Sequence, residues 1–172
     1  KVEGNTYPHS ILPGTWSYID MTGKRATEME FEAAIDFGGG RAVVKNNGKW
    51  GVIDNEFNLV VDYQYDNVQI YTDSFTYGLL AVEQDGNWGY IDQDGKVIID
   101  FKYDEAYEFQ NGLASVCVDN KYGFINTKGE VVIPFRFQYA QTFFEGLAVA
   151  RDNIDGHSGF GYINTKGEYV IE

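Results

Sequence analysis

One short sequence recurs along this chain of 172 residues with little change. It reads KWGVID at residues 49–54, NWGYID at 87–92, KYGFIN at 121–126 and GFGYIN at 159–164. If Trp16 is included, the aromatic position repeats at intervals of 34, 38, 34 and 38 residues. A period of this size is typical of solenoids and propellers, whose neighbouring units bury each other's apolar faces because one unit cannot bury its own. We therefore expect a tandem array.

Each unit predicts four short strands separated by turns. In the unit that starts at Trp88, we expect strands at 88–92, 96–100, 103–109 and 113–118. Gly, Asn and Asp separate these apolar and aromatic runs, which is the chemistry of tight hairpin turns. Because four is an even number of strands, every unit can enter the next in the same direction.

The predicted fold is all-β, a tandem repeat of about five small antiparallel β-meander units. The units start at residues 16, 50, 88, 122 and 160, and the last one is partial. Residues 1–15 are expected to form an N-terminal leader or cap strand, and residues 16–172 the repeat domain. We favour an open, curved, solenoid-like array. A compact five-bladed, propeller-like ring is the alternative, and adjacent chain ends would indicate it.

The repeat also predicts which side chains form the core. We expect the recurring aromatic ring and the Ile three residues after it to be mainly buried between units. Alanines recur at a second position and suggest close packing there (Ala34, Ala106 and Ala140). The single cysteine, Cys117, lies in the strand-like segment ASVCVD and is expected to be a small buried side chain.

These residues resemble the bacterial WG-repeat family, also called KWG repeats. The segments that carry the resemblance are KWGVID, NWGYID…GKVIID, YDEAYEFQNGLASV and KYGFINTKGEVVIPF. It covers residues 16–172, although the first unit departs from the pattern, with Ser17 where the others have Gly. The resemblance implies an all-β interaction module, often secreted or on the cell surface of bacteria. It brings no catalytic residues.

The net charge of −13 restricts the partners. Nucleic-acid binding depends on Lys and Arg that neutralise phosphates, and an anionic membrane surface also repels an acidic chain. No apolar run approaches the roughly 18 residues of a membrane span. We therefore expect no nucleic acid and no membrane insertion. A solvated acidic surface is the favoured interpretation of the charge, and a cationic partner is the more specific alternative.

Several groups of residues have some features of a chemical site. The segment DQDG (92–95) resembles the start of a calcium loop, but Lys96 and Tyr103 stand where later ligands belong, so a plain turn is favoured. The acidic residues offer paired carboxylates for a glycosidase. Acidic residues are so abundant in this chain that such a pair is weak evidence for that activity. One recurrent position holds Glu32, Asp66, Asp104 and Gln138; we expect it to accept a hydrogen bond from a backbone turn. No cofactor, metal or catalytic residue is predicted.

Two insertions, within residues 69–78 and 151–160, add four residues each to otherwise faithful units. Inserted loops are frequent binding sites. Aromatic side chains outside the repeat pattern are typical anchors for a partner, whereas Phe75 matches a core position of the other units. The candidate binding residues are Tyr71, Tyr77, Phe144 and, in the second insertion, His157.

The sequence therefore predicts a non-enzymatic scaffold that presents a repeat surface and inserted loops to a protein partner. A module that binds carbohydrate or the cell envelope is the alternative, and a glycoside hydrolase ranks third. The resemblance favours an extracytoplasmic location or the cell surface of a bacterium, and the sequence specifies neither the partner nor the oligomeric state.

Overall fold

A computed structural model describes residues 7–12, 14–69, 75–152 and 159–171. These residues form strands and turns, and no helix occurs among them. The strands are β1 (Tyr7–Leu12), β2 (Thr15–Ile19), β3 (Ala33–Ala34), β4 (Arg41–Asn46), β5 (Lys49–Asp54), β6 (Leu59–Tyr65), β7 (Asn67–Gln69), β8 (Leu80–Gln84), β9 (Asn87–Ile91), β10 (Val97–Tyr103), β11 (Glu105–Ala106), β12 (Leu113–Val118), β13 (Lys121–Asn126), β14 (Val131–Phe137), β15 (Tyr139–Ala140), β16 (Leu147–Arg151), β17 (Gly161–Asn164) and β18 (Tyr169–Ile171).

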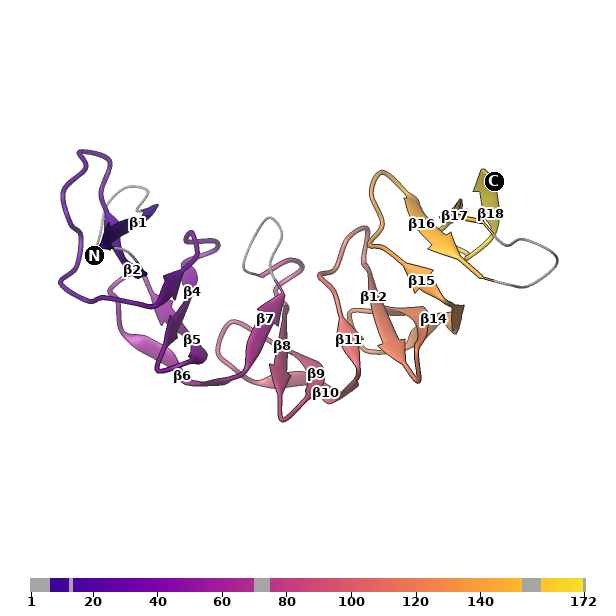
Figure 1. Cartoon of the computed structure of the whole chain (residues 1–172), viewed down its shortest axis with the longest axis horizontal. Coiled ribbons are helices and arrows are strands. Elements are labelled where there is room, and N and C mark those ends of the chain that lie inside the picture. The colour runs from indigo at the N-terminus through magenta and orange to yellow at the C-terminus, as the bar shows by residue number, and fades with distance from the viewer. Residues whose placement is uncertain (1–6, 13, 70–74, 153–158, 172) are drawn as a thin grey trace.

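The strands form five antiparallel sheets in which consecutive strands are neighbours. Sheet 1 contains β1 and β2, sheet 2 contains β3–β6, sheet 3 contains β7–β10, sheet 4 contains β11–β14 and sheet 5 contains β15–β18. The sheets follow one another along an open curve, with the N-terminal and C-terminal ends at opposite tips (Figure 1). The predicted open array of antiparallel meanders is therefore confirmed, and the ring is wrong because the ends do not meet.

The sheets are out of phase with the sequence units by half a period. Sheet 3, for example, takes β7 and β8 from the unit that starts at Trp50, and β9 and β10 from the unit that starts at Trp88. The strand predicted at 103–109 is also wrong. Strand β10 continues to Tyr103, the chain turns at Asp104, and β11 has only two residues.

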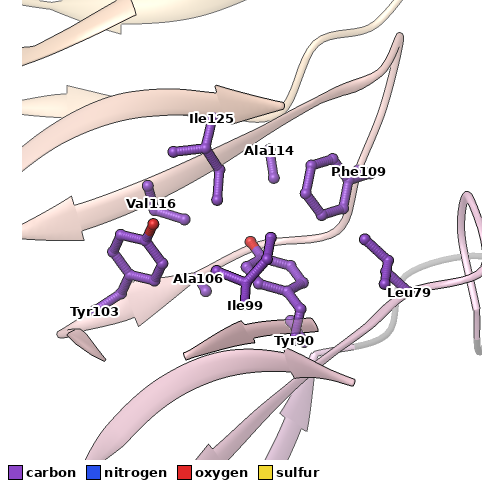
Figure 2. Packing of buried hydrophobic residues seen from close by; sticks show 10 residues of the cluster. Leu79, Tyr90, Ile99, Tyr103, Ala106, Phe109, Ala114, Val116 and Ile125 are labelled. Atoms are coloured by element: carbon purple, nitrogen blue, oxygen red, sulfur yellow. The ribbon is translucent and has the colours of Figure 1, made fainter. Parts of the chain in front are cut away.

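Each central strand packs its side chains into two different cores. On β9, Tyr90 belongs to the cluster between sheets 3 and 4, whereas the next residue, Ile91, belongs to the cluster between sheets 2 and 3. Adjacent side chains on a strand point to opposite faces, so one dipeptide joins both neighbours. Figure 2 shows the cluster between sheets 3 and 4, where Tyr90 and Ile99 lie opposite Phe109, Ala114 and other residues of sheet 4.

The prediction that the recurring aromatic rings are core is wrong in part. The Ile three residues later is fully buried in four of the units, and Ala34, Ala106 and Ala140 are buried as well. The rings of Trp50, Trp88 and Tyr122, however, are only half-buried, and Phe160 is exposed. The ring follows directly after the hairpin turn, so it lies at the margin of the inter-sheet core.

The Gly after each ring is required by a close approach of the next strand. A Cβ built on Gly89 would lie 2.7 Å from the carbonyl oxygen of Ile99, and Gly51, Gly123 and Gly161 show the same contact at 2.7–2.8 Å. In the first unit Ser17 of β2 is tolerated because the segment that follows, residues 20–32, forms no regular strand that approaches it closely. The Ser17 Oγ donates a hydrogen bond of 2.9 Å to the Met29 carbonyl.

A second Gly explains how one sheet docks on the previous one. Gly95 has a φ of +81°, which disfavours any side chain, and a Cβ there would lie 2.7 Å from Val61 of sheet 2. Gly129 and Gly167 pack in the same way on the preceding sheet, against Ile99 and Ile133. The recurring Gly therefore marks a contact between sheets as well as a turn.

Candidate binding surfaces

The recurrent acidic residues are part of the scaffold. Asp54 Oδ1 accepts hydrogen bonds from the backbone N–H groups of Glu56 and Asn58, at 2.8 and 2.9 Å. The equivalent Asp or Asn closes the same turn in the other units (Asp20, Asp92, Asn126 and Asn164). The segment DQDG (92–95) forms one of these turns, as predicted. In each of these turns the Oδ1 atom of the Asp or Asn therefore accepts backbone hydrogen bonds.

The position held by Glu32, Asp66 and Asp104 also behaves as predicted. Each carboxylate accepts a hydrogen bond of 2.8–3.0 Å from a backbone N–H in the next hairpin, given by Gly48, Asp85 and Asp119 respectively. A second bond, from the Lys49 ammonium, is the main cause that lowers the pKa of Asp66. Among the described residues, no group of three or more His, Cys, Asp or Glu side chains could hold a metal ion.

Two of the four predicted binding residues can be located. Tyr77 and Phe144 are 58% and 75% exposed, and Phe75 is buried as expected. Tyr77 lies in the turn before β8 and Phe144 in the turn before β16, and both turns project from the inner side of the curve (Figure 1). The turn before β12 lies between them, so the two rings do not form one cluster. Tyr71 and His157 lie outside the described residues.

A surface that the sequence reasoning missed follows one edge of the array. Strands β6, β10, β14 and β18 are the outer strands of their sheets, and their first residues carry exposed apolar side chains. We call this surface the edge stripe. Its members are 38–53% exposed: Leu59, Val97, Ile98, Val131, Val132, Val170 and Ile171.

Six members of the edge stripe occupy two adjacent positions that recur in the four units from Trp50 onward, which distinguishes them from scattered exposed apolar residues. The seventh, Ile171, stands at the position of the buried Ile99 and Ile133 and is exposed in the last described strand. The apolar pairs after each turn (LV, VI, VV and YV) cover these two recurring positions and could have revealed most of the stripe. In sequence such pairs look like the interior of a strand, and only the strand order shows that they lie on a free edge.

The backbone along this edge is poorly suited to pairing with another strand. Pro134 has no N–H group to donate, and exposed acidic residues, Asp62 and Asp100, stand at the equivalent positions of β6 and β10. Proline, charge and irregular register are devices by which natural sheets protect their edges, and β10 and β14 both shift register along their partner strands. A partner is therefore expected to contact side chains here.

A cavity of about 310 Å³ lies between sheets 4 and 5. Its lining consists of Tyr107, which follows β11, and of residues 139–142, which include β15. On the wall formed by sheet 4, the hydroxyl groups of Tyr107 and Tyr122 both donate to Oε2 of Glu105, at 2.9 and 2.7 Å. Burial and the Glu105 carboxylate together raise the pKa of Tyr122, so its hydroxyl stays protonated and keeps donating to Glu105.

The opposite wall of the cavity is fixed in a similar way. Gln141 donates its side-chain amide to the Tyr139 hydroxyl at 2.6 Å, and the Tyr139 ring contacts the rings of Tyr122 and Phe160 at 6.3 and 5.5 Å between centroids. The cavity is thus walled by tyrosines from two sheets. Cys117, which is buried as predicted, has its pKa raised by burial and by nearby carboxylates, as expected of an unreactive thiol.

Comparison with known proteins identifies the repeat. The model of a family described as WG containing repeat matches residues 16–50, 50–88, 88–122, 122–153 and 160–172. No curated protein matches the chain. Among solved structures, a protein of unknown function from Bacteroides caccae is similar, with 12% identity and a TM-score of 0.35, over 98% of this chain and 77% of that one. In the described residues, no helix has the length and apolar character needed to span a membrane.

Proposed function

Because this chain belongs to the family of proteins built from WG containing repeats, we propose that it is a non-enzymatic interaction module that binds a protein partner along its repeated surface. The edge stripe is the observation that supports this proposal most. It extends over four sheets, and large apolar side chains at a recurring exposed position are typical of a protein interaction surface.

The chemistry of the carboxylates supports a non-enzymatic role. The acidic residues that recur in the units accept hydrogen bonds from backbone turns, so their positions are explained by folding. A general acid or nucleophile needs a carboxyl group that is free to reach a substrate. Because Pro134 has no N–H group to donate to a further strand, we expect the partner to contact side chains and not to extend a sheet.

Capture of partners by the immobilised chain, from an extract of the source cells, tests this function. The double variant Val97→Ser, Val131→Ser removes two stripe residues from different sheets. Met21→Ser is the matched control, because Met21 is 78% exposed and lies in the turn after β2, outside the stripe.

We expect proteins that are retained by the original chain and by Met21→Ser but not by the double variant. The proposal is contradicted when all three retain the same proteins in equal amounts. Circular dichroism on each variant establishes that the fold is unchanged, since surface substitutions of this kind alter the free energy of unfolding by about 0.5 kcal/mol or less.

A further inference from the structure

The repeat supplies an internal comparison at the recurring aromatic ring. In sheet 2, Lys45 pairs with Trp50 across the hairpin, and its ammonium lies 5.6 Å from the ring centroid. In sheet 5 the equivalent residue, Arg151, places its guanidinium 5.1 Å from the ring centroid of Phe160. The chain thus supplies its own cation to the ring in these two sheets.

Sheets 3 and 4 depart from this arrangement, since the residue opposite Trp88 in sheet 3 is Glu83; sheet 4 is the one with a cavity beside the row. The residue opposite Tyr122 is Cys117, which is uncharged and buried, so no cation comes from that position. Instead a carboxylate stands in the same row, because Glu105 pairs with Cys117 and accepts hydrogen bonds from the hydroxyl groups of two tyrosines. The ring that carries a cation in sheets 2 and 5 is here accompanied by a carboxylate that can bind one.

The cavity beside this row also offers a backbone carbonyl. The hydroxyl of Tyr90 donates to the Tyr107 carbonyl at 2.7 Å, and Tyr18 makes the same bond to Ile35, also at 2.7 Å. At the corresponding position before sheet 5 stands Phe124, which has no hydroxyl. The carbonyl of Gln141, a residue that lines the cavity, therefore does not receive this bond.

We propose that the cavity between sheets 4 and 5 binds the charged end of an arginine or lysine side chain of the partner. Arg and Lys carry donors and no acceptor, which fits a site with a carboxylate and a backbone carbonyl at its margin. A cation over a tyrosine ring gains further stabilisation. Among the described residues, none that lines the cavity is basic; Arg151, which pairs with Tyr139, is directed over Phe160.

The volume of the cavity and the negative net charge of the chain agree with such a ligand. A volume of about 310 Å³ is near the lower limit of roughly 300 Å³ for ligand pockets and accommodates one extended side chain. The net charge of −13 raises the local concentration of basic segments and speeds their association. The site deepens the proposed function, on which it rests, by giving the partner a basic residue.

A titration followed by amide NMR tests the site on the whole chain. The probe is an N-acetylated, C-amidated Gly-Gly-Arg-Gly-Gly peptide, and its control is the same peptide with citrulline, which has nearly the shape of Arg without its charge. Maltose is the third ligand. We expect the Arg peptide, in the millimolar range, to shift the amide signals of Tyr107, Gln141 and Thr142, with at least tenfold weaker binding of the citrulline peptide.

Two variants and a matched control place the effect at the cavity. Glu105→Gln should weaken the Arg peptide at least fivefold, whereas Glu56→Gln, which removes the same charge from an exposed turn in sheet 2, should change it less than twofold. Phe124→Tyr should also weaken the peptide, because its hydroxyl can bond the Gln141 carbonyl as Tyr90 bonds Tyr107.

The proposal is overturned if the citrulline peptide or maltose shifts these amides as strongly as the Arg peptide, if no ligand shifts them, or if both glutamate variants weaken binding equally. The capture experiment keeps the two proposals apart. Partners lost from the Val97→Ser, Val131→Ser variant, together with a failed titration, refute the cavity and leave the proposed function standing. A successful titration with unchanged capture refutes the edge stripe alone.

Discussion

Replacing Gly89 with Ala tests why the Gly of the repeat is required. Gly89 lies on β9, is not in the left-handed region and is buried, so strain in the backbone conformation plays no part. The added Cβ would lie 2.7 Å from the carbonyl oxygen of Ile99 and 3.0 Å from the backbone nitrogen of Phe101. Both atoms belong to β10, which therefore has to move away from β9.

The expected cost follows from that displacement. An ordinary contact of this kind is at least about 3.4 Å, so β10 must retreat by roughly 0.7 Å although both faces of the sheet are packed against neighbours. Forcing an extra carbon into a close-packed region costs about 1–3 kcal/mol, and the conformational gain of replacing Gly within a strand offsets roughly 0.5–1 kcal/mol of it. For a chain of this length, a net loss of about 1–2 kcal/mol lowers the Tm by about 2–8 °C.

Thermal unfolding followed by circular dichroism measures this change. Gly159→Ala is the control, since no atom lies within 4 Å of its Cβ position and its φ is not in the left-handed region; its Tm should be unchanged or slightly raised. Gly51→Ala and Gly123→Ala should behave as Gly89→Ala does, because the added Cβ atoms would lie 2.7 and 2.8 Å from the equivalent carbonyl oxygens, those of Val61 and Ile133. A Gly89→Ala variant as stable as the control would refute the steric explanation of the repeat.

Further variants test the turns and the two environments of apolar side chains. The pKa of Asp54 is lowered, mainly by the Asn58 side chain, so its stabilising effect is present above about pH 4 and is lost as the pH falls through its folded-state pKa. Asp54→Asn should keep the turn, as Asn126 does in its own unit, and should flatten the loss of stability in chemical unfolding between pH 5 and pH 2.5; a steeper loss would contradict this. Ile125→Ala empties a fully buried position and should cost about 2–5 kcal/mol in urea unfolding. Val131→Ala, at a side chain that is 53% exposed, should cost about 0.5 kcal/mol or less, and equal losses in the two variants would show that the sheets do not share a core.

The array was predictable because each recurring residue reports a recurring contact. Ile91 and its equivalents pack on the preceding sheet, Gly95 and its equivalents touch it, and Asp54 and its equivalents close a turn. A contact of this kind leaves the same residue type at the same interval, so spacing alone indicates antiparallel meanders in an open or closed series. Only the separation of the chain ends distinguishes the two.

The boundaries of the sheets were not predictable, because the repeat interval does not show at which residue each sheet begins. The sequence shows that four strands recur, but which four share hydrogen bonds depends on the chain reversal at Asp66 and Asp104, where β6 and β10 end and the next sheet begins. The edge stripe was missed for the same reason. A Val-Ile pair such as Val97 and Ile98 is buried in a central strand and exposed on an outer one, and the order of strands decides between them.

The same reasoning indicates where a partner of the proposed kind would find differences between the sheets. Positions that fix one sheet on the next admit little change, because Gly89 faces a backbone atom and Ile91 a closed core. The row beside the aromatic ring has no such constraint, and there the sheets differ: Lys45 in sheet 2 is replaced by Cys117 in sheet 4. A scaffold that repeats its contacts between sheets can vary the charge in this row at little cost in stability, so under the proposed function the residues that depart from the repeat, such as Lys45 and Cys117, are those by which a partner would distinguish one sheet from another.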